Sequence, residues 1–276
     1  MKFHKILIFL LTAVSTSVMA TDSSLASATY KLAKNNGSSN FTETTDALTS
    51  SSYITINGVD IKVGVTAWSD SGTNNPDNVL ENGSIQGWWS GGNVGYGIEN
   101  SDYHWGGDSH AMDNSGDGGG VDFDMFLLSF SEAVTLGGAS FTWVEGSNGN
   151  KEVTVAGLND ISAFESGANS TWSSVTSAIV NNTLGHFGIG SKGSNNLFES
   201  KFVDITGSAK YWLVGAYNTI FDTNSNGHFN SVELKLSSLT VSQEKQTPIT
   251  EVSEPGALAL MSLGLGLVLY RRKRRA

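Results

Sequence analysis

Apolar and polar residues alternate on both sides of Asn57-Gly58. An alternation with a period of two predicts strands with one buried face, and Asn-Gly between two such runs is a strong signal for a two-residue hairpin turn. The sequence therefore predicts a β-hairpin whose apolar positions are Ile54, Ile56, Val59, Ile61, Val63 and Val65.

Five further segments have the composition of short strands, and clusters of Gly, Asn, Ser and Asp that supply turns lie between them. No stretch between the two ends has a long helical period, and the best candidate for a helix is 172–181. There is also no repeat of 20 to 50 residues that would indicate a solenoid or propeller. We predict an all-β fold, an antiparallel β-sandwich of the jelly-roll type with Gly/Asn-rich loops, over residues 53–243. The five segments are 125–130, 139–144, 152–156, 211–217 and 232–241.

Composition excludes several classes of protein. The 276 residues contain 32 glycines, three prolines and no cysteine, with 16 basic and 26 acidic side chains that give a net charge of −10. Without cysteine there is no disulfide scaffold, thiolate metal site or thiol catalysis. A strongly acidic chain is also a poor general binder of nucleic acid, so we expect no nucleic-acid partner.

The N-terminus has the pattern of a secretory signal. Lys2 and Lys5 precede an apolar run, and Val18-Met19-Ala20 supplies the small residues of a signal peptidase site. We predict a cleaved signal peptide over 1–20. The alternative is an uncleaved anchor, for which the apolar run is short. Residues 21–52, rich in Ser, Thr and Asn, are expected to form a flexible lead-in or a loose strand.

The C-terminus has three consecutive parts after a linker at 244–251. A short element, Val252-Ser253-Glu254-Pro255, is followed by the apolar and glycine-rich run 256–270. The run is followed by a basic cluster that stays on the cytoplasmic side of a membrane. At about 1.5 Å per residue its helix is about 22 Å long, so it crosses a bilayer only with local thinning or snorkelling. We predict a single transmembrane sorting helix within 252–276, ending in Arg271, Arg272, Lys273, Arg274 and Arg275.

This three-part layout resembles the PEP-CTERM sorting signal of Gram-negative bacteria. The resemblance implies that an exosortase, a membrane transpeptidase, cuts near Glu254-Pro255 and passes the protein to the cell envelope, cell surface or extracellular matrix. The usual pattern has Pro before the Glu, where this chain has Ser253. A GPI signal ends in its apolar tail and does not fit. A plain C-terminal anchor stays open as the alternative.

The body of the chain is similar to exosortase-dependent surface proteins over about 55–245. The resemblance rests on the order of four sequence blocks, and it implies a location and no established enzymatic activity. The blocks are 95–100, 109–114, 124–130 with the following 134–136, and 211–218.

Residues 222–233 match the spacing of a calcium-binding loop. Oxygen ligands stand at the required positions, Gly227 allows the sharp turn, and a Glu closes the motif. The flanking sequence reads as strands, so a hairpin loop without metal is the alternative. The candidate calcium ligands are Asp222, Asn224, Asn226, Asn230 and Glu233.

A second acidic region has no Lys or Arg within it. Its carboxylates repel one another unless they are dispersed over a surface or share a cation. A solvated loop and a cation site using Asp113, Asp117, Asp122 or Asp124 are both open. The histidines of the mature chain are expected to have a structural or surface role, because no zinc motif contains them. The acidic residues are Glu99, Asp102, Asp108, Asp113, Asp117, Asp122 and Asp124; the histidines are His104, His110, His186 and His228.

Aromatic residues are concentrated just before this acidic region, interleaved with Gly and Asn. Flat rings beside amide and carboxylate groups are typical of sugar-binding faces, and packing in the core is the alternative. The candidate stacking residues are Trp88, Trp89 and Trp105.

The leading hypothesis is a non-enzymatic, exported protein of the envelope or matrix, associated with exopolysaccharide. Signal peptidase and exosortase are its expected processing partners, and it contacts the membrane transiently through its C-terminal helix. A carbohydrate-binding module and a secreted polysaccharide hydrolase are the alternatives. Residues 21–250 carry nine lysines and 24 acidic side chains, so the mature protein is more acidic than the whole chain.

Overall fold

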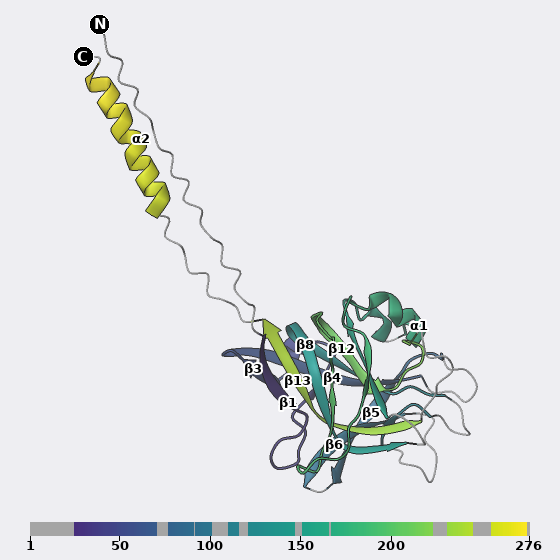
Figure 1. The fold of residues 1–276 in the computed structure, drawn as a ribbon. Coiled ribbons are helices and arrows are strands. Elements are labelled where there is room, and N and C mark those ends of the chain that lie inside the picture. Colours follow the sequence, from purple (N-terminus) through teal and green to yellow (C-terminus); the bar gives the residue numbers. More distant parts are fainter. Residues whose placement is uncertain are drawn as a thin grey trace. The chain divides into compact units, whose positions relative to one another are not determined.

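The structure is a computed structural model, and most of its elements are strands (Figure 1). It describes residues 25–70, 77–90, 92–100, 110–115, 121–146, 151–165, 167–222, 231–244 and 255–274. The chain divides into two units, Met1–Glu244 and Lys245–Ala276. All described strands belong to the first unit, which confirms the all-β prediction.

Thirteen strands, four short helical turns and one longer helix are present in the described residues. They are β1 (Leu25–Lys31), β2 (Thr42–Glu43), η1 (Ala47–Thr49), β3 (Tyr53–Ile56), β4 (Val59–Ser69), β5 (Glu81–Ser90), β6 (Asn93–Glu99), β7 (Met112–Asp113), β8 (Met125–Gly146), β9 (Glu152–Leu158), η3 (Ser162–Phe164), α1 (Trp172–Val175), η4 (Thr176–Ala178), β10 (Gly185–Gly188), β11 (Phe198–Lys201), β12 (Ala209–Ala216), β13 (Val232–Glu244) and α2 (Pro255–Lys273).

The predicted hairpin is confirmed. β3 and β4 pair in antiparallel fashion, with Ile56 opposite Val59. Both residues of the turn have positive φ, 52° at Asn57 and 78° at Gly58. This is the left-handed conformation that a two-residue hairpin needs at both positions, and Asn and Gly adopt it most readily.

One long strand replaces two predicted ones. The segments 125–130 and 139–144 are parts of β8, which runs without interruption from Met125 to Gly146. Its first part pairs with β4 and β12, and its second part pairs with β11 and β13. β8 therefore belongs to one continuous sheet, whose main order is β1-β13-β6-β5-β4-β8-β12-β9-β10, and its additional pairing with β13 closes part of this sheet on itself.

The apolar residues of the first unit form two clusters. The larger lies inside the sheet and includes Phe130, Phe141 and Trp212. The smaller includes Trp68, Leu127 and Trp172, which lies on α1. Adjacent residues of β8 alternate between the two clusters, so all of Met125 to Phe130 is buried. Burial of both faces explains the continuous apolar run that the sequence has there.

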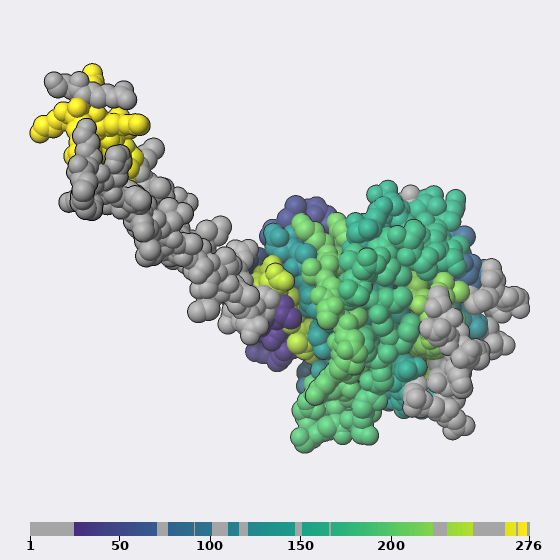
Figure 2. Space-filling view, turned by 45° about the horizontal axis from the view of Figure 1, so that its top comes forward, coloured from purple at the N-terminus to yellow at the C-terminus, as the bar shows by residue number. Residues whose placement is uncertain are grey.

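The helical prediction over 172–181 is confirmed in a shorter form, as α1 followed directly by η4. One face of the first unit is formed mainly by the middle of the chain, drawn teal to green in Figure 2.

Of the two alternatives for the lead-in, a loose strand and a flexible arm, residues 25–31 form a strand. β1 pairs with β13 over seven residues, from Leu25 opposite Glu244 to Lys31 opposite Ser238. Tyr30 and Leu32 are buried in the larger cluster, and the Tyr30 hydroxyl lies 2.8 Å from the Ser52 hydroxyl. Sparse apolar residues were enough to form this strand, because Ala26, Ala28 and Tyr30 alternate onto its more buried face, whereas Leu25 is exposed.

The C-terminal unit contains α2, which begins at Pro255 and has Arg271, Arg272 and Lys273 in its last turn. Among the helices of the described residues, none is both long and apolar enough to span a membrane. The predicted transmembrane helix is corrected accordingly: the segment is helical, but its apolar run ends at Tyr270, where the basic residues begin.

Candidate functional site

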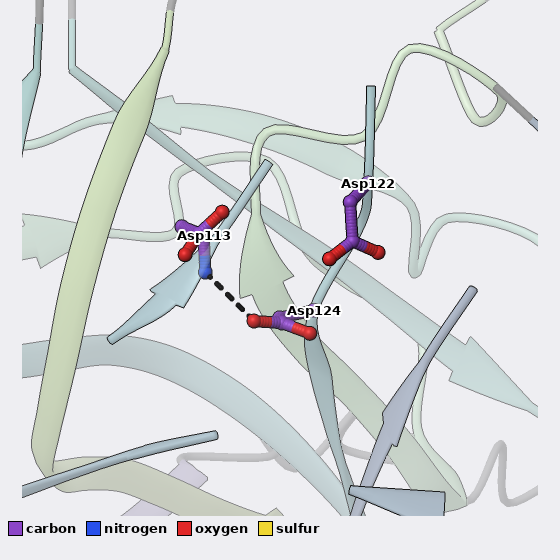
Figure 3. Close-up of side chains that lie close together, drawn as sticks. All are labelled: Asp113, Asp122 and Asp124. Atoms are coloured by element: carbon purple, nitrogen blue, oxygen red, sulfur yellow. Dashed lines mark hydrogen bonds between the residues drawn. The ribbon is translucent and has the colours of Figure 1, made fainter. Parts of the chain in front are cut away.

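Three aspartates of the second acidic region lie together beside the start of β8 (Figure 3). Asp113 ends β7, and Asp122 and Asp124 precede β8. A carboxylate oxygen from each lies within 4.8 Å of the other two. Asp122 and Asp124 are each 1% exposed, whereas Asp113 is half-buried. The sequence-based candidates therefore meet in space, except Asp117, which lies outside the described residues.

Neutral hydrogen-bond donors hold the two buried carboxylates. The Asn100 amide donates to Asp122 Oδ2 at 2.9 Å and to Asp124 Oδ1 at 3.0 Å. The Ser69 hydroxyl donates to Asp122 Oδ1 at 2.9 Å, and the Asp113 N–H donates to Asp124 Oδ2 at 3.2 Å. These donors orient the carboxylates without adding positive charge.

Burial raises the pKa of Asp124 well above its usual range, and the neighbouring Asp122 and Asp113 carboxylates raise it further. A third buried aspartate, Asp70, lies near the group. The pKa of Asp70 is raised to about 8, mainly by burial and also by the neighbouring Asp122 carboxylate. The N–H of Phe123, which donates to Asp70 Oδ1 at 2.8 Å, acts in the opposite direction and lowers this pKa. Either a proton or a bound cation relieves this repulsion.

The chemistry of the cluster is that of a hard-cation or proton site. Carboxylate oxygens are the ligands that Ca²⁺ prefers, so the donor set fits this ion. Asp122 and Asp124 are too buried to act on a polymer substrate. Sequence reasoning missed Asp70; the available signal was an acidic residue directly after the apolar strand that ends in Trp68-Ser69.

The predicted calcium loop is described only at its two ends. Asn224, Asn226 and Asn230 lie outside the described residues. Asp222 accepts a hydrogen bond from the Tyr217 hydroxyl at 2.7 Å. Glu233 lies on β13, opposite Asp113 of β7. Glu233, the last residue of the predicted calcium loop, is thus a cross-strand neighbour of Asp113 from the second acidic region. Spacing along the chain did not indicate this pairing.

His186, which looks isolated in sequence, belongs to a polar group with Tyr217 and Asp222. Its Nδ1 lies 2.9 Å from the Thr154 hydroxyl, and its ring meets the Tyr217 ring edge-on at 5.1 Å between centroids. Burial lowers the pKa of His186, although the nearby Asp222 carboxylate raises it. Burial also raises the pKa of Glu152, as does Asp222.

The three tryptophans proposed for sugar stacking do not share one surface. Trp88 and Trp89 are consecutive residues of β5, so their side chains leave opposite faces of the strand. The Trp88 ring covers the ammonium of the buried Lys235 at 5.1 Å and stacks on His110 at 6.2 Å. Trp89 lies against Gly37 instead. Trp105 lies outside the described residues.

A groove of about 650 Å³ lies between the end of β4, the start of β5 and the segment 163–170. Glu81 and Glu165 line it, together with hydroxyl and amide side chains. Two carboxylates in one groove are the minimum that a glycosidase requires, so this is where the hydrolase alternative would act.

The sorting element is only partly described. Val252, Ser253 and Glu254 lie outside the described residues, as does Arg275, and Pro255 is the first residue of α2. Arg271, Arg272, Lys273 and Arg274 are exposed. No family model, curated protein or solved structure matches this chain.

Proposed function

We propose that this chain is an exported surface or extracellular matrix protein of a Gram-negative bacterium that exosortase processes at its C-terminus. The observation that carries the proposal is the separation of α2, with its basic last turn, from a β unit that ends at Glu244. Such a tail can be removed without disturbing the fold. Signal peptidase and exosortase are the processing partners, and the tail contacts the membrane only transiently, until it is cut.

The delivered β unit acts by binding and not by catalysis. This is supported by the burial of its clustered aspartates, which keeps Asp122 and Asp124 away from any polymer. We assign the unit to a jelly-roll-like β-sandwich. In that arrangement two layers of strands would enclose the larger apolar cluster, and the loops would present Asn, Ser and Thr to an exopolysaccharide-rich layer.

Mass spectrometry of the mature protein from its native host tests the proposal. We expect the N-terminus at Thr21 and a C-terminus near Glu254, free of Arg271 to Ala276. A Glu254→Ala, Pro255→Ala variant is expected to keep its tail, whereas Lys245→Gln, in the linker, is expected to be processed normally. A wild-type protein with an intact basic tail would overturn the proposal.

The groove that contains Glu81 and Glu165 supports a second candidate function, polysaccharide hydrolysis. Release of reducing ends from a polysaccharide by wild type, and its loss in Glu165→Gln, would establish that function. A lack of release by wild type would remove it.

A further inference from the structure

Two neighbouring hollows share one wall, the segment 31–35, which begins at the last residue of β1. One, of about 240 Å³, contains Trp89; the other, of about 470 Å³, contains Tyr53. Lys31, Lys34 and Asn35 line both. Trp89 is 59% exposed and Tyr53 is 55% exposed, so each hollow presents an aromatic ring to solvent.

Trp89 is held in place by a glycine turn. The Gly37 N–H donates to the Lys34 carbonyl at 2.9 Å, and Gly37 has φ of +83°. A Cβ at Gly37 would lie 2.5 Å from the Trp89 ring, so only glycine fits both the turn and the ring. One part of the ring therefore rests on backbone while the remainder faces the hollow, which orients the ring before a ligand arrives.

The charge of the two hollows is opposite to that of the chain. Lys31 and Lys34 are exposed, and none of the described residues that line either hollow is acidic. Residues 21–250 carry only nine lysines against 24 acidic side chains. On such a protein a local pair of ammonium groups favours an anionic ligand over a cationic one at this place.

The remaining lining groups are neutral hydrogen-bonding side chains. Ser237 and Asn93 border the first hollow, and Asn40 and Thr55 border the second. Rings that stack on apolar sugar faces, hydroxyl and amide groups for sugar hydroxyls, and lysines for carboxylates together match one ligand class.

We propose that the surface formed by Trp89, Lys31, Lys34 and Tyr53 binds an acidic polysaccharide whose chain carries uronate carboxylates. Adjacent hollows on either side of a shared lysine wall suit consecutive sugar units of one chain. The inference rests on the proposed association with polysaccharide and names its ligand class.

Binding of polygalacturonate to the purified full chain tests it, with neutral dextran as the comparison polymer. We expect polygalacturonate to bind, dextran to bind at least about tenfold more weakly, and added salt to weaken the binding. Trp89→Ala and the double variant Lys31→Gln, Lys34→Gln are each expected to weaken binding about tenfold. The double variant Lys201→Gln, Lys210→Gln removes the same charge from exposed positions of β11 and β12 and is expected to bind as wild type does.

Equal binding of both polymers, no binding of polygalacturonate, or equal losses in the two lysine double variants would each overturn the inference. Circular dichroism of every variant separates lost binding from lost fold. The assay does not depend on processing. A processed protein that does not bind polygalacturonate contradicts this inference alone, and a binding protein with an intact tail contradicts the sorting proposal alone.

Discussion

Asp113 and Asp124 exchange two hydrogen bonds: the Asp113 N–H donates to Asp124 Oδ2 at 3.2 Å, and the Asp124 N–H donates to the Asp113 carbonyl at 2.8 Å. The pair fixes β7 beside the start of β8 and holds an acidic side chain in the interior. These two hydrogen bonds stabilise the fold, whereas burial of the ionised Asp124 carboxylate beside Asp122 and Asp113 destabilises it. Stability should therefore depend on how the carboxylates of this region are neutralised.

The first prediction concerns pH. The folded-state pKa of Asp70, about 8, lies above its value in the unfolded chain, as does that of Asp124. The native state therefore holds more protons than the unfolded state between about pH 4 and 8. The contribution that protonated Asp70 and Asp124 make to the free energy of unfolding is fully present below about pH 4 and is lost as the pH rises toward 8. Each differing proton contributes up to about 1.4 kcal/mol per pH unit.

Urea unfolding at pH 5, 7 and 8.5 measures this effect. Asp70→Asn should flatten the dependence, because an amide does not ionise, and its stability relative to wild type should improve from pH 5 to pH 8.5. Glu132→Gln, which changes an exposed carboxylate of β8, should keep the wild-type slope. Parallel slopes in wild type and Asp70→Asn would contradict the prediction.

The second prediction concerns calcium. We expect Ca²⁺ to raise the melting temperature, because three carboxylates within 4.8 Å attract a divalent cation. At about 100 times the dissociation constant the gain is about 2.7 kcal/mol, which corresponds to roughly 5 to 11 °C for a unit of this size. Asp124→Asn should abolish the rise. Asp222→Ala should retain it, since Asp222 is bonded to Tyr217.

Two results of that titration would decide against this assignment. A rise that survives Asp124→Asn and disappears in Asp222→Ala would move the ion to the loop 222–233. No rise in wild type would mean that protons alone neutralise the cluster.

The third prediction compares two adjacent, exposed tryptophans. Trp88 is 47% exposed but covers the ammonium of Lys235, which is fully buried and also lies 5.7 Å from the Trp143 ring. Trp88→Ala should cost about 1 to 3 kcal/mol, since it removes a partly desolvated cation–π contact and packing over a buried charge. Trp89→Ala should cost less than about 1 kcal/mol. Chemical unfolding of both variants gives the comparison, and equal losses would contradict it.

Features that depend on local interactions were predicted from the sequence, whereas features that depend on partners far along the chain were not. The hairpin at Asn57-Gly58 depends on local turn chemistry and was predicted in full. The continuity of β8 and the pairing of β1 with β13 depend on partners far along the chain, which local patterns do not identify. β5 and β6 were missed because glycines interrupt their apolar alternation.

The residues of the candidate site were likewise predicted only in part from the sequence. The density of carboxylates identified the acidic region, and the cluster of Asp113, Asp122 and Asp124 lies within it. Asp70 and Glu233 reach the same neighbourhood only through strand pairing. The separation of Trp88 from Trp89 follows from strand geometry, once the segment is known to be a strand and not a loop.

The last prediction concerns the two ends of the β unit. A chain that ends at Glu244 should keep the wild-type melting temperature, because the second unit is separate. Weakening β1 should be costly, since Tyr30 is buried in the larger cluster and β1 pairs with β13 along its whole length. Tyr30→Ala should cost about 3 to 5 kcal/mol, and Tyr30→Phe, which removes only the hydroxyl and its bonds to Ser52 and the Asn40 carbonyl, about 0.5 to 1.5 kcal/mol. If Tyr30→Ala unfolded at the same urea concentration as wild type, residues 25–31 would be the flexible arm that composition suggested. If Tyr30→Ala is instead less stable than both wild type and Tyr30→Phe, β1 is an integral strand of the folded unit.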